Sequence, residues 1–311
     1  MYKFVMKRIL MMIPVLIGIS FIIFTIISFT PGNPAKLILG ERASQEAIDK
    51  LNEELGYNDP FLVKYFNYLK DAFRGDFGTS YKSGLRVIDE ITDKFPTTLL
   101  LAIIVVVISI IISIPLGVLA AVKKGSLFDG ASMVIALLFT AMPAFWLGLL
   151  LILSLSLKFD LFPVTGSETL AHFILPALTL SAGNVAMILR MTRSSMLEVV
   201  RQDYIRTARA KGATEKLVIY KHALKNALIP VVTAVGVNFG YTLGGSVLIE
   251  SVFGMKGLGT LLLTAIRTKD VPLVMGSVLF MSLAFSIVTL LVDISYGYID
   301  PRIKAQYKSI A

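Results

Sequence analysis

The sequence predicts an all-α membrane protein with six transmembrane helices and both termini in the cytoplasm. Six stretches without Asp, Glu, Lys or Arg support this: 9–29, 97–122, 130–157, 169–189, 226–249 and 271–292. Each is long enough to cross a bilayer, which takes ~20 apolar residues. Only 16% of the 311 residues are charged, against about 25% in soluble domains. Membrane-spanning strands are shorter and alternate in polarity, so helices are favoured.

Composition excludes several classes of function. The chain has no cysteine and only two histidines, so it offers neither a disulfide framework nor a thiolate metal site. His172 and His222 lie far apart in unlike contexts and cannot form a zinc cluster. The net charge of +9 comes from short segments between apolar spans, which indicates membrane topology rather than a nucleic-acid partner. We expect no metal and no cofactor in this chain.

The distribution of charge orients the helices. Four segments predicted to be cytoplasmic hold 17 basic and 6 acidic residues: 1–8, 123–129, 190–225 and 293–311. Three segments predicted to be outside hold 13 basic and 15 acidic residues: 30–96, 158–168 and 250–270. Basic residues concentrate on the cytoplasmic side of membrane proteins, so both termini are expected there.

Three of the spans need comment as helices. The first, 9–29, exceeds the ~7–15 apolar residues of a signal peptide, so we interpret it as a retained helix. The fourth contains His172, Pro176 and Asn184, and the fifth is rich in glycine. Neighbouring helices can satisfy backbone groups freed by proline and glycine, so both remain predicted spans.

The outer segment 30–96 is predicted to hold two helices. Ser44 can cap the first, which ends at Gly56. The second begins at Asp59-Pro60, carries an apolar side and ends before Gly75. Two interpretations stay open: a cap that packs on the membrane domain, or a docking surface for an external partner. The predicted domains are thus 1–29, 30–96 and a core over 97–311.

The cytoplasmic segment 190–225 is predicted to form two helices joined at a glycine. Apolar residues recur at helical spacing over Ser194–Lys211, and Gly212 can end that helix. Thr214 can cap a second helix over Glu215–Lys225. We call this helix–glycine–helix segment the elbow. From the residues alone, it either contacts a cytoplasmic partner or lies on anionic lipid.

The elbow resembles the cytoplasmic loop of ATP-binding-cassette (ABC) importer permeases. The resemblance is carried by Arg206-Thr-Ala-Arg-Ala-Lys-Gly212 followed by Ile229-Pro230. The general family pattern is Glu-Ala-Ala, three residues and Gly, and only Ala208 and Gly212 match it. This variant form is similar to the dipeptide/oligopeptide/nickel class of these permeases.

Further segments resemble the same class, in one order along the whole chain. They are Leu55–Tyr65, Arg74–Ser80, Phe162–Gly166, Leu175–Thr179, Glu250–Phe253, Gly257–Gly259 and Asp300–Arg302. Lys256 departs from the pattern, because that class usually has proline there.

The resemblance implies that the elbow is a coupling element seated in a groove of a separate ATPase. The residues concerned are Arg206, Thr207, Ala208, Arg209, Ala210, Lys211, Gly212, Ala213 and Thr214. This chain has no Gly-x-x-x-x-Gly-Lys-Ser/Thr phosphate loop. It is therefore expected not to be an enzyme, with ATP and Mg bound by partner subunits. Implied partners are a second related permease, two ATPases and an extracytoplasmic substrate-binding protein, in a bacterial plasma membrane and its lipid.

Polar residues inside apolar spans are candidates for the translocation pathway. Inside the spans these are Asn184, Asn238 and Tyr241, and Glu250 at the outer end of the fifth span is added as a candidate for an outer gate. The alternative for the neutral residues is an interhelical hydrogen bond, and for Glu250 a plain interface charge. Gly236, Gly240 and Gly244 form a small-xxx-small pattern that permits close helix contact, either with a second permease or within this chain.

Together these features predict a permease subunit of an ATP-driven importer for di- or oligopeptides. The spans are free of charge, which suits a peptide better than a bare metal ion that needs ligands. The alternatives are a nickel or metal-chelate permease of the same class and an ion-coupled secondary transporter. The latter often shows internal repeats and a midplane ion site, and we find neither here. No mid-span pairing of Ser with His, or of two Asp, supports an intramembrane enzyme.

Overall fold

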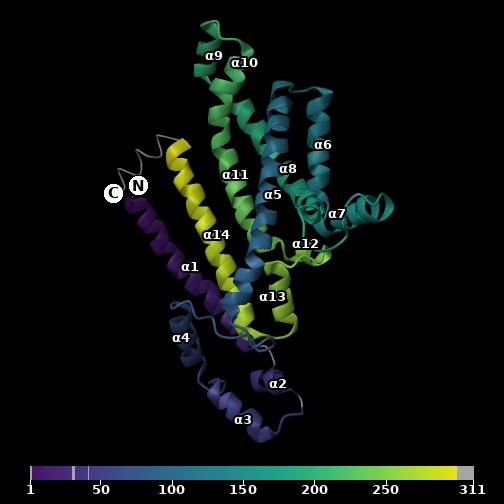
Figure 1. Ribbon diagram of the computed structural model, residues 1–311. Coiled ribbons are helices and arrows are strands. Elements are labelled where there is room, and N and C mark those ends of the chain that lie inside the picture. The colour runs from purple at the N-terminus through teal and green to yellow at the C-terminus, as the bar shows by residue number, and fades with distance from the viewer. Residues whose placement is uncertain (1, 30–31, 41, 300–311) are drawn as a thin grey trace.

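The computed structural model describes residues 2–29, 32–40 and 42–299 and is all-helical over them (Figure 1). The only strand-like pairing among these residues is an isolated bridge between Thr79 and Arg86. The motif Asp300–Arg302 and the end of the predicted cytoplasmic tail lie outside the described residues. The all-α prediction is therefore confirmed.

Five helices are long and apolar enough to cross a membrane. The long elements are α1 (Tyr2–Ser28), α5 (Val87–Val122), α8 (Ala171–Val199), α11 (Leu224–Gly245) and α14 (Val271–Ile299). The short elements α10 (Glu215–Leu217) and η2 (Val218–Ala223), the latter a π-helical stretch, extend α11 into one continuous helix over Glu215–Gly244.

α5 and α8 pack closely at the centre of the bundle. A side chain at Gly117 would come within 2.6 Å of the Thr192 Cβ and 2.9 Å of the Leu189 carbonyl oxygen. α1 lies at the edge of the bundle beside α14 (Figure 1), and only 6% of its apolar window is buried. Its exposed surface must therefore face lipid or another protein.

The third predicted span is not one straight helix. It is divided into α6 (Leu127–Ala141), α7 (Ala144–Leu151) and the π-helical η1 (Ile152–Lys158), and the two halves are bent by 100°. The cause is Pro143, which lacks an N–H and pushes Met142 out of the helical region, to φ −82° and ψ 126°. The described residues thus hold five spans, or six if the bent pair crosses once.

The outer segment contains the two expected helices and a short third one. They are α2 (Pro34–Leu39), α3 (Gln45–Glu54) and α4 (Phe61–Ala72). Ser44 caps α3 by accepting a hydrogen bond from the Ala47 N–H at 3.3 Å. An aromatic face of α4 packs on α1, where the rings of Phe21 and Tyr65 lie 5.2 Å apart. This contact supports the interpretation as a cap on the membrane domain.

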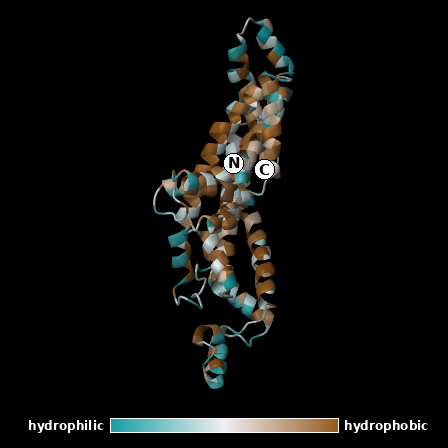
Figure 2. Cartoon of the chain, turned by 90° about the vertical axis from the view of Figure 1, so that its right-hand side faces the viewer, coloured by the Kyte–Doolittle hydropathy of each residue, from teal (hydrophilic) through white to brown (hydrophobic). Residues whose placement is uncertain are grey.

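The elbow and the outer segment lie at opposite ends of the molecule (Figure 1). The apolar residues follow the long helices between them, and hydrophilic residues gather toward the ends (Figure 2). This arrangement agrees with placing the two segments on opposite sides of a membrane. The direction of the chain across the membrane stays a prediction from charge.

Candidate functional site

The elbow is more sharply folded than the sequence predicts. The single helix expected over Ser194–Lys211 is wrong, because α8 ends at Val199 and a new helix, α9 (Asp203–Ala210), begins after extended Gln202. The break turns α9 so that Ile205 becomes fully buried. It packs in a cluster with Met196 and Val218 that joins the elbow to the ends of α5 and α8.

Gly212 ends α9 in the left-handed conformation, with φ of 80°. Two hydrogen bonds complete a Schellman motif: the Gly212 N–H donates to the Arg209 carbonyl at 2.9 Å, and the Ala213 N–H to the Ala208 carbonyl at 3.2 Å. Thr214 stands at the start of α10, but its side chain makes no capping hydrogen bond. The turn is therefore fixed by backbone bonds rather than by the expected threonine cap.

An ion pair closes the elbow across this glycine. Arg209 Nε lies 2.7 Å from Glu215 Oε1, and Nη2 lies 3.3 Å from Oε2. The carboxylate raises the pKa of Arg209 above its usual value. Of the nine predicted coupling residues, Ala208 and Ala213 are half-buried against the elbow cluster and the other seven are exposed. The tip therefore exposes three basic side chains, those of Arg206, Arg209 and Lys211, among small and polar residues.

Three predicted pathway residues lie on neighbouring faces of α8 and α11. Asn238 donates to the Ala234 carbonyl at 2.8 Å and contacts Met187 Sδ at 3.5 Å. Asn184 lies one turn from Met187 on α8 and is half-buried. Tyr241 lies about one turn beyond Asn238 and is 65% exposed.

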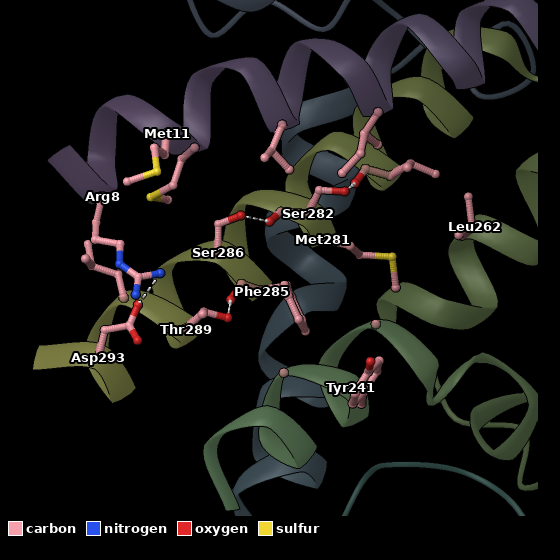
Figure 3. Close-up of a pocket in the computed structure, with 17 residues that line it drawn as sticks. Arg8, Met11, Tyr241, Leu262, Met281, Ser282, Phe285, Ser286, Thr289 and Asp293 are labelled. Carbon is pink, nitrogen blue, oxygen red and sulfur yellow. Dashed lines mark hydrogen bonds and ion pairs between the residues drawn. The ribbon is translucent and has the colours of Figure 1, made fainter. Parts of the chain in front are cut away.

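Tyr241 also lines a groove of about 620 Å³ between α1, α11, α13 (Leu258–Arg267) and α14 (Figure 3). At its far end, Arg8 of α1 and Asp293 of α14 form an ion pair at 3.0 Å. The hydroxyls of Ser282 and Ser286 donate to carbonyls of their own helix. The surface of the groove is therefore largely apolar.

Glu250, the fourth predicted pathway residue, is buried in this structure and does not line the groove. It lies on α12 (Val247–Val252) and is fully buried. Its carboxylate accepts hydrogen bonds from Thr98 and Ser246, each at 2.7 Å, and from two backbone N–H groups of α13. Buried charges persist only when they are paired or hydrogen-bonded. Within this chain the carboxylate therefore links α5, α12 and the first turn of α13.

The small-xxx-small glycines mainly serve packing within the chain. A Cβ at Gly236 would collide with Val292, and one at Gly240 would come within 2.6 Å of the Phe285 ring. Only Gly244 has open space beside it. Two of the three glycines therefore seat α14 on α11.

Lys256, which differs from the class pattern, links two loops through an ion pair with Glu168. Its Nζ lies 3.1 Å from Glu168 Oε1, and this pair lowers the pKa of Glu168. His172 Nε2 lies 3.4 Å from the other oxygen of Glu168. Over the described ranges, no group of three His, Cys, Asp or Glu is placed to hold a metal ion.

The fold is that of a multi-pass membrane protein, and comparison with known proteins gives its family. Residues 113–305 match the family described as binding-protein-dependent transport system inner membrane component, and residues 1–102 match the N-terminal model of such components. The chain belongs to this family of ABC importer permeases of the bacterial inner membrane, in its dipeptide/oligopeptide class.

Two curated relatives cover nearly the whole chain. The dipeptide transport system permease protein DppB of Alkalihalophilus pseudofirmus is 42% identical over 98% of this chain and 100% of its own length. The glutathione transport system permease protein GsiC of Escherichia coli K12 is 41% identical over 98% of this chain and 99% of its own.

A solved structure supports the fold. An inward-facing MetNI methionine ABC transporter matches with a TM-score of 0.56 and 20% identity, over 68% of this chain and 97% of that chain. At that identity the match supports the fold alone.

Proposed function

We propose that this chain is the membrane subunit that couples ATPase closure to the import of di- or oligopeptides. The elbow carries the proposal: an exposed basic turn, fixed by Gly212 and by the Arg209–Glu215 pair, stands at one end of the helix that continues into α11. Two relatives named for dipeptide and glutathione transport favour a peptide substrate.

The proposed complex contains a second related permease, two ABC ATPases and an extracytoplasmic substrate-binding protein. The ATPases bind ATP and Mg and supply the hydrolysis, so this chain itself is non-catalytic. Closure of the ATPases draws the two elbows together and opens the pathway outward, and hydrolysis resets it. Asn184, Asn238 and Tyr241 line the pathway as neutral polar groups that suit varied peptide side chains.

Copurification from the native membrane tests the assembly. An affinity-tagged chain should bring down a stoichiometric pair of ATPases and a second permease. Purification of the intact chain alone, with solute uptake driven by an ion gradient in vesicles, would instead favour the ion-coupled alternative.

Stimulation of ATP hydrolysis tests the substrate. In the reconstituted complex, binding protein loaded with a dipeptide should raise the ATPase rate, while binding protein with nickel, free or chelated, should not. Stimulation by nickel and not by peptide would overturn the peptide assignment in favour of the metal alternative, leaving the fold and the coupling proposal intact.

A further inference from the structure

Glu250 connects three elements through one buried carboxylate. Oε1 accepts from Thr98 Oγ1 on α5 and from Ser246 Oγ, which directly follows α11, each at 2.7 Å. Oε2 accepts from the backbone N–H groups of Gly259 at 2.8 Å and Thr260 at 3.2 Å. These two groups belong to the first turn of α13, where N–H groups lack helical partners and favour an anion. Every bond is made to a buried or half-buried partner.

The surrounding backbone is built to admit this carboxylate. A Cβ at Gly257 would come within 2.5 Å of Glu250 Cδ. A Cβ at Gly259 would lie 2.7 Å from the Val247 Cα. The Leu258 N–H donates to Thr98 Oγ1 at 2.8 Å, so Thr98 bridges the carboxylate and the start of α13. We call Thr98, Ser246, Glu250 and the first turn of α13 the Glu250 hub.

The hub lies at the end of α11 opposite the elbow. One helix runs from Glu215 at the elbow to Gly244, and the chain then turns at Ser246 into α12. The hub also lies between two buried clusters. Phe253 and Met255 belong to one, with α5 and α8, and Leu258 belongs to the other, with α5 and α14. The α12–α13 hairpin (Val247–Arg267) is thus fixed to the bundle, and α11 is attached to it through Ser246.

We propose that Glu250 is the positioning residue that anchors the α12–α13 hairpin to α5, so that force applied at the elbow moves α11 against a fixed hairpin. This rests on the proposed coupling function. The joint lies at Gly244, which has open space around it, and at Ser246, which the carboxylate holds. Without the anchor, the hairpin would follow α11, and hydrolysis would no longer be converted efficiently into transport.

The test compares Glu250→Gln with Glu54→Gln in the complete reconstituted complex. Glutamine keeps only one acceptor oxygen, so either the two hydroxyl donors or the two N–H groups of α13 lose the acceptor that they have now. Glu54 is an exposed carboxylate on α3, and its substitution removes the same charge. We expect Glu250→Gln to transport roughly tenfold less peptide per ATP hydrolysed, with the ATPase rate per assembled complex retained. Glu54→Gln should match wild type.

Site-directed labelling gives a second readout. The chain has no cysteine, so single cysteines report cleanly. Met255 is only 2% exposed, so a cysteine in Met255→Cys should resist a membrane-impermeant maleimide during turnover. In the Glu250→Gln background the same cysteine should react. Lys256→Cys, which is exposed, should react in both. If Glu250→Gln does not assemble, Thr98→Val, which removes one bond to the carboxylate, serves in both assays with a smaller expected effect.

Three results would overturn the inference, the first two of them as follows. One is unchanged transport per ATP in an assembled hub variant, and the other is a protected Met255→Cys in that variant during turnover. A loss of transport and hydrolysis in equal proportion would also count against it, because it would show a merely structural role. If the proposed coupling function itself is wrong, the result is different: Gly212→Val would transport normally, whether or not the Glu250 hub is intact.

Discussion

Gly212 holds a backbone conformation that other residues resist. Its φ of 80° costs an L-residue roughly 1 kcal/mol, and a β-branched residue more. No atom lies within 4 Å of the position a Cβ would take, so a substitution acts through the backbone and not through a clash within this chain. We therefore expect Gly212→Val to insert into the membrane and assemble, but to lose most transport.

Gly212→Ala should have a milder effect. Gly130→Ala is the matched control, because Gly130 also has free space but lies within helix α6 at a negative φ, and it should transport normally. The measurement is peptide uptake normalised to the amount of chain in the membrane. Normal uptake by the valine variant would show that the elbow does not couple.

The conformation of Gly212 was predictable from sequence, and the role of Glu250 was not. A glycine between two helical patterns has few explanations other than a helix end. A lone glutamate at the end of an apolar span gives no sign of its partners, because Thr98 belongs to another helix and two donors are backbone groups. The sequence indicates only that a buried carboxylate must receive hydrogen bonds, and it does not show which residues donate them.

At the scale of elements, an ion pair joins the start of α6 to the last turns of α8. Arg193 donates through Nε and Nη2 to the two oxygens of Asp129, the latter bond at 2.7 Å, and the Gly125 N–H donates to the same carboxylate. Asp129 is almost fully buried. Removing one partner of such a pair is costly, because it leaves a charge without compensation.

We expect Asp129→Asn to lower the unfolding temperature of the complex, and the double variant Asp129→Asn/Arg193→Met to lower it less. The measurement is thermal unfolding of the purified complex in one detergent, with Asp93→Asn, an exposed carboxylate on α5, as the control. A double variant less stable than Asp129→Asn would contradict this account.

The periodicity of apolar residues predicted most helices but did not predict two breaks, one in the third span and one after Val199. Pro143 inside the third span was a visible signal, since proline and the residue before it both disfavour a continuous helix. The break after Val199 had no such signal, because the apolar spacing continues past it into α9. It arises from tertiary packing of Ile205, which a local pattern does not contain.

For the whole molecule, the elbow and the outer segment lie at opposite ends of a long apolar body (Figures 1 and 2). With the charge bias, this predicts that position 60 faces outside and position 215 faces the cytoplasm. Pro60→Cys should react with an impermeant maleimide in intact cells, and Glu215→Cys only after the cells are opened. Labelling of position 215 in intact cells would show that the predicted orientation is wrong.

The long range of the Glu250 hub has a consequence for biosynthesis. Thr98 and Glu250 are separated by 152 residues, so the ribosome has released α5 long before the carboxylate is made. The first turn of α13, which supplies two further donors, follows later still. A released chain truncated between Glu250 and Gly259 would carry this carboxylate without two of its four donors, and such a group is costly at the edge of the bilayer. The hub is therefore completed only after the first turn of α13 has been made, so its hydrogen bonds form late in the synthesis of the chain.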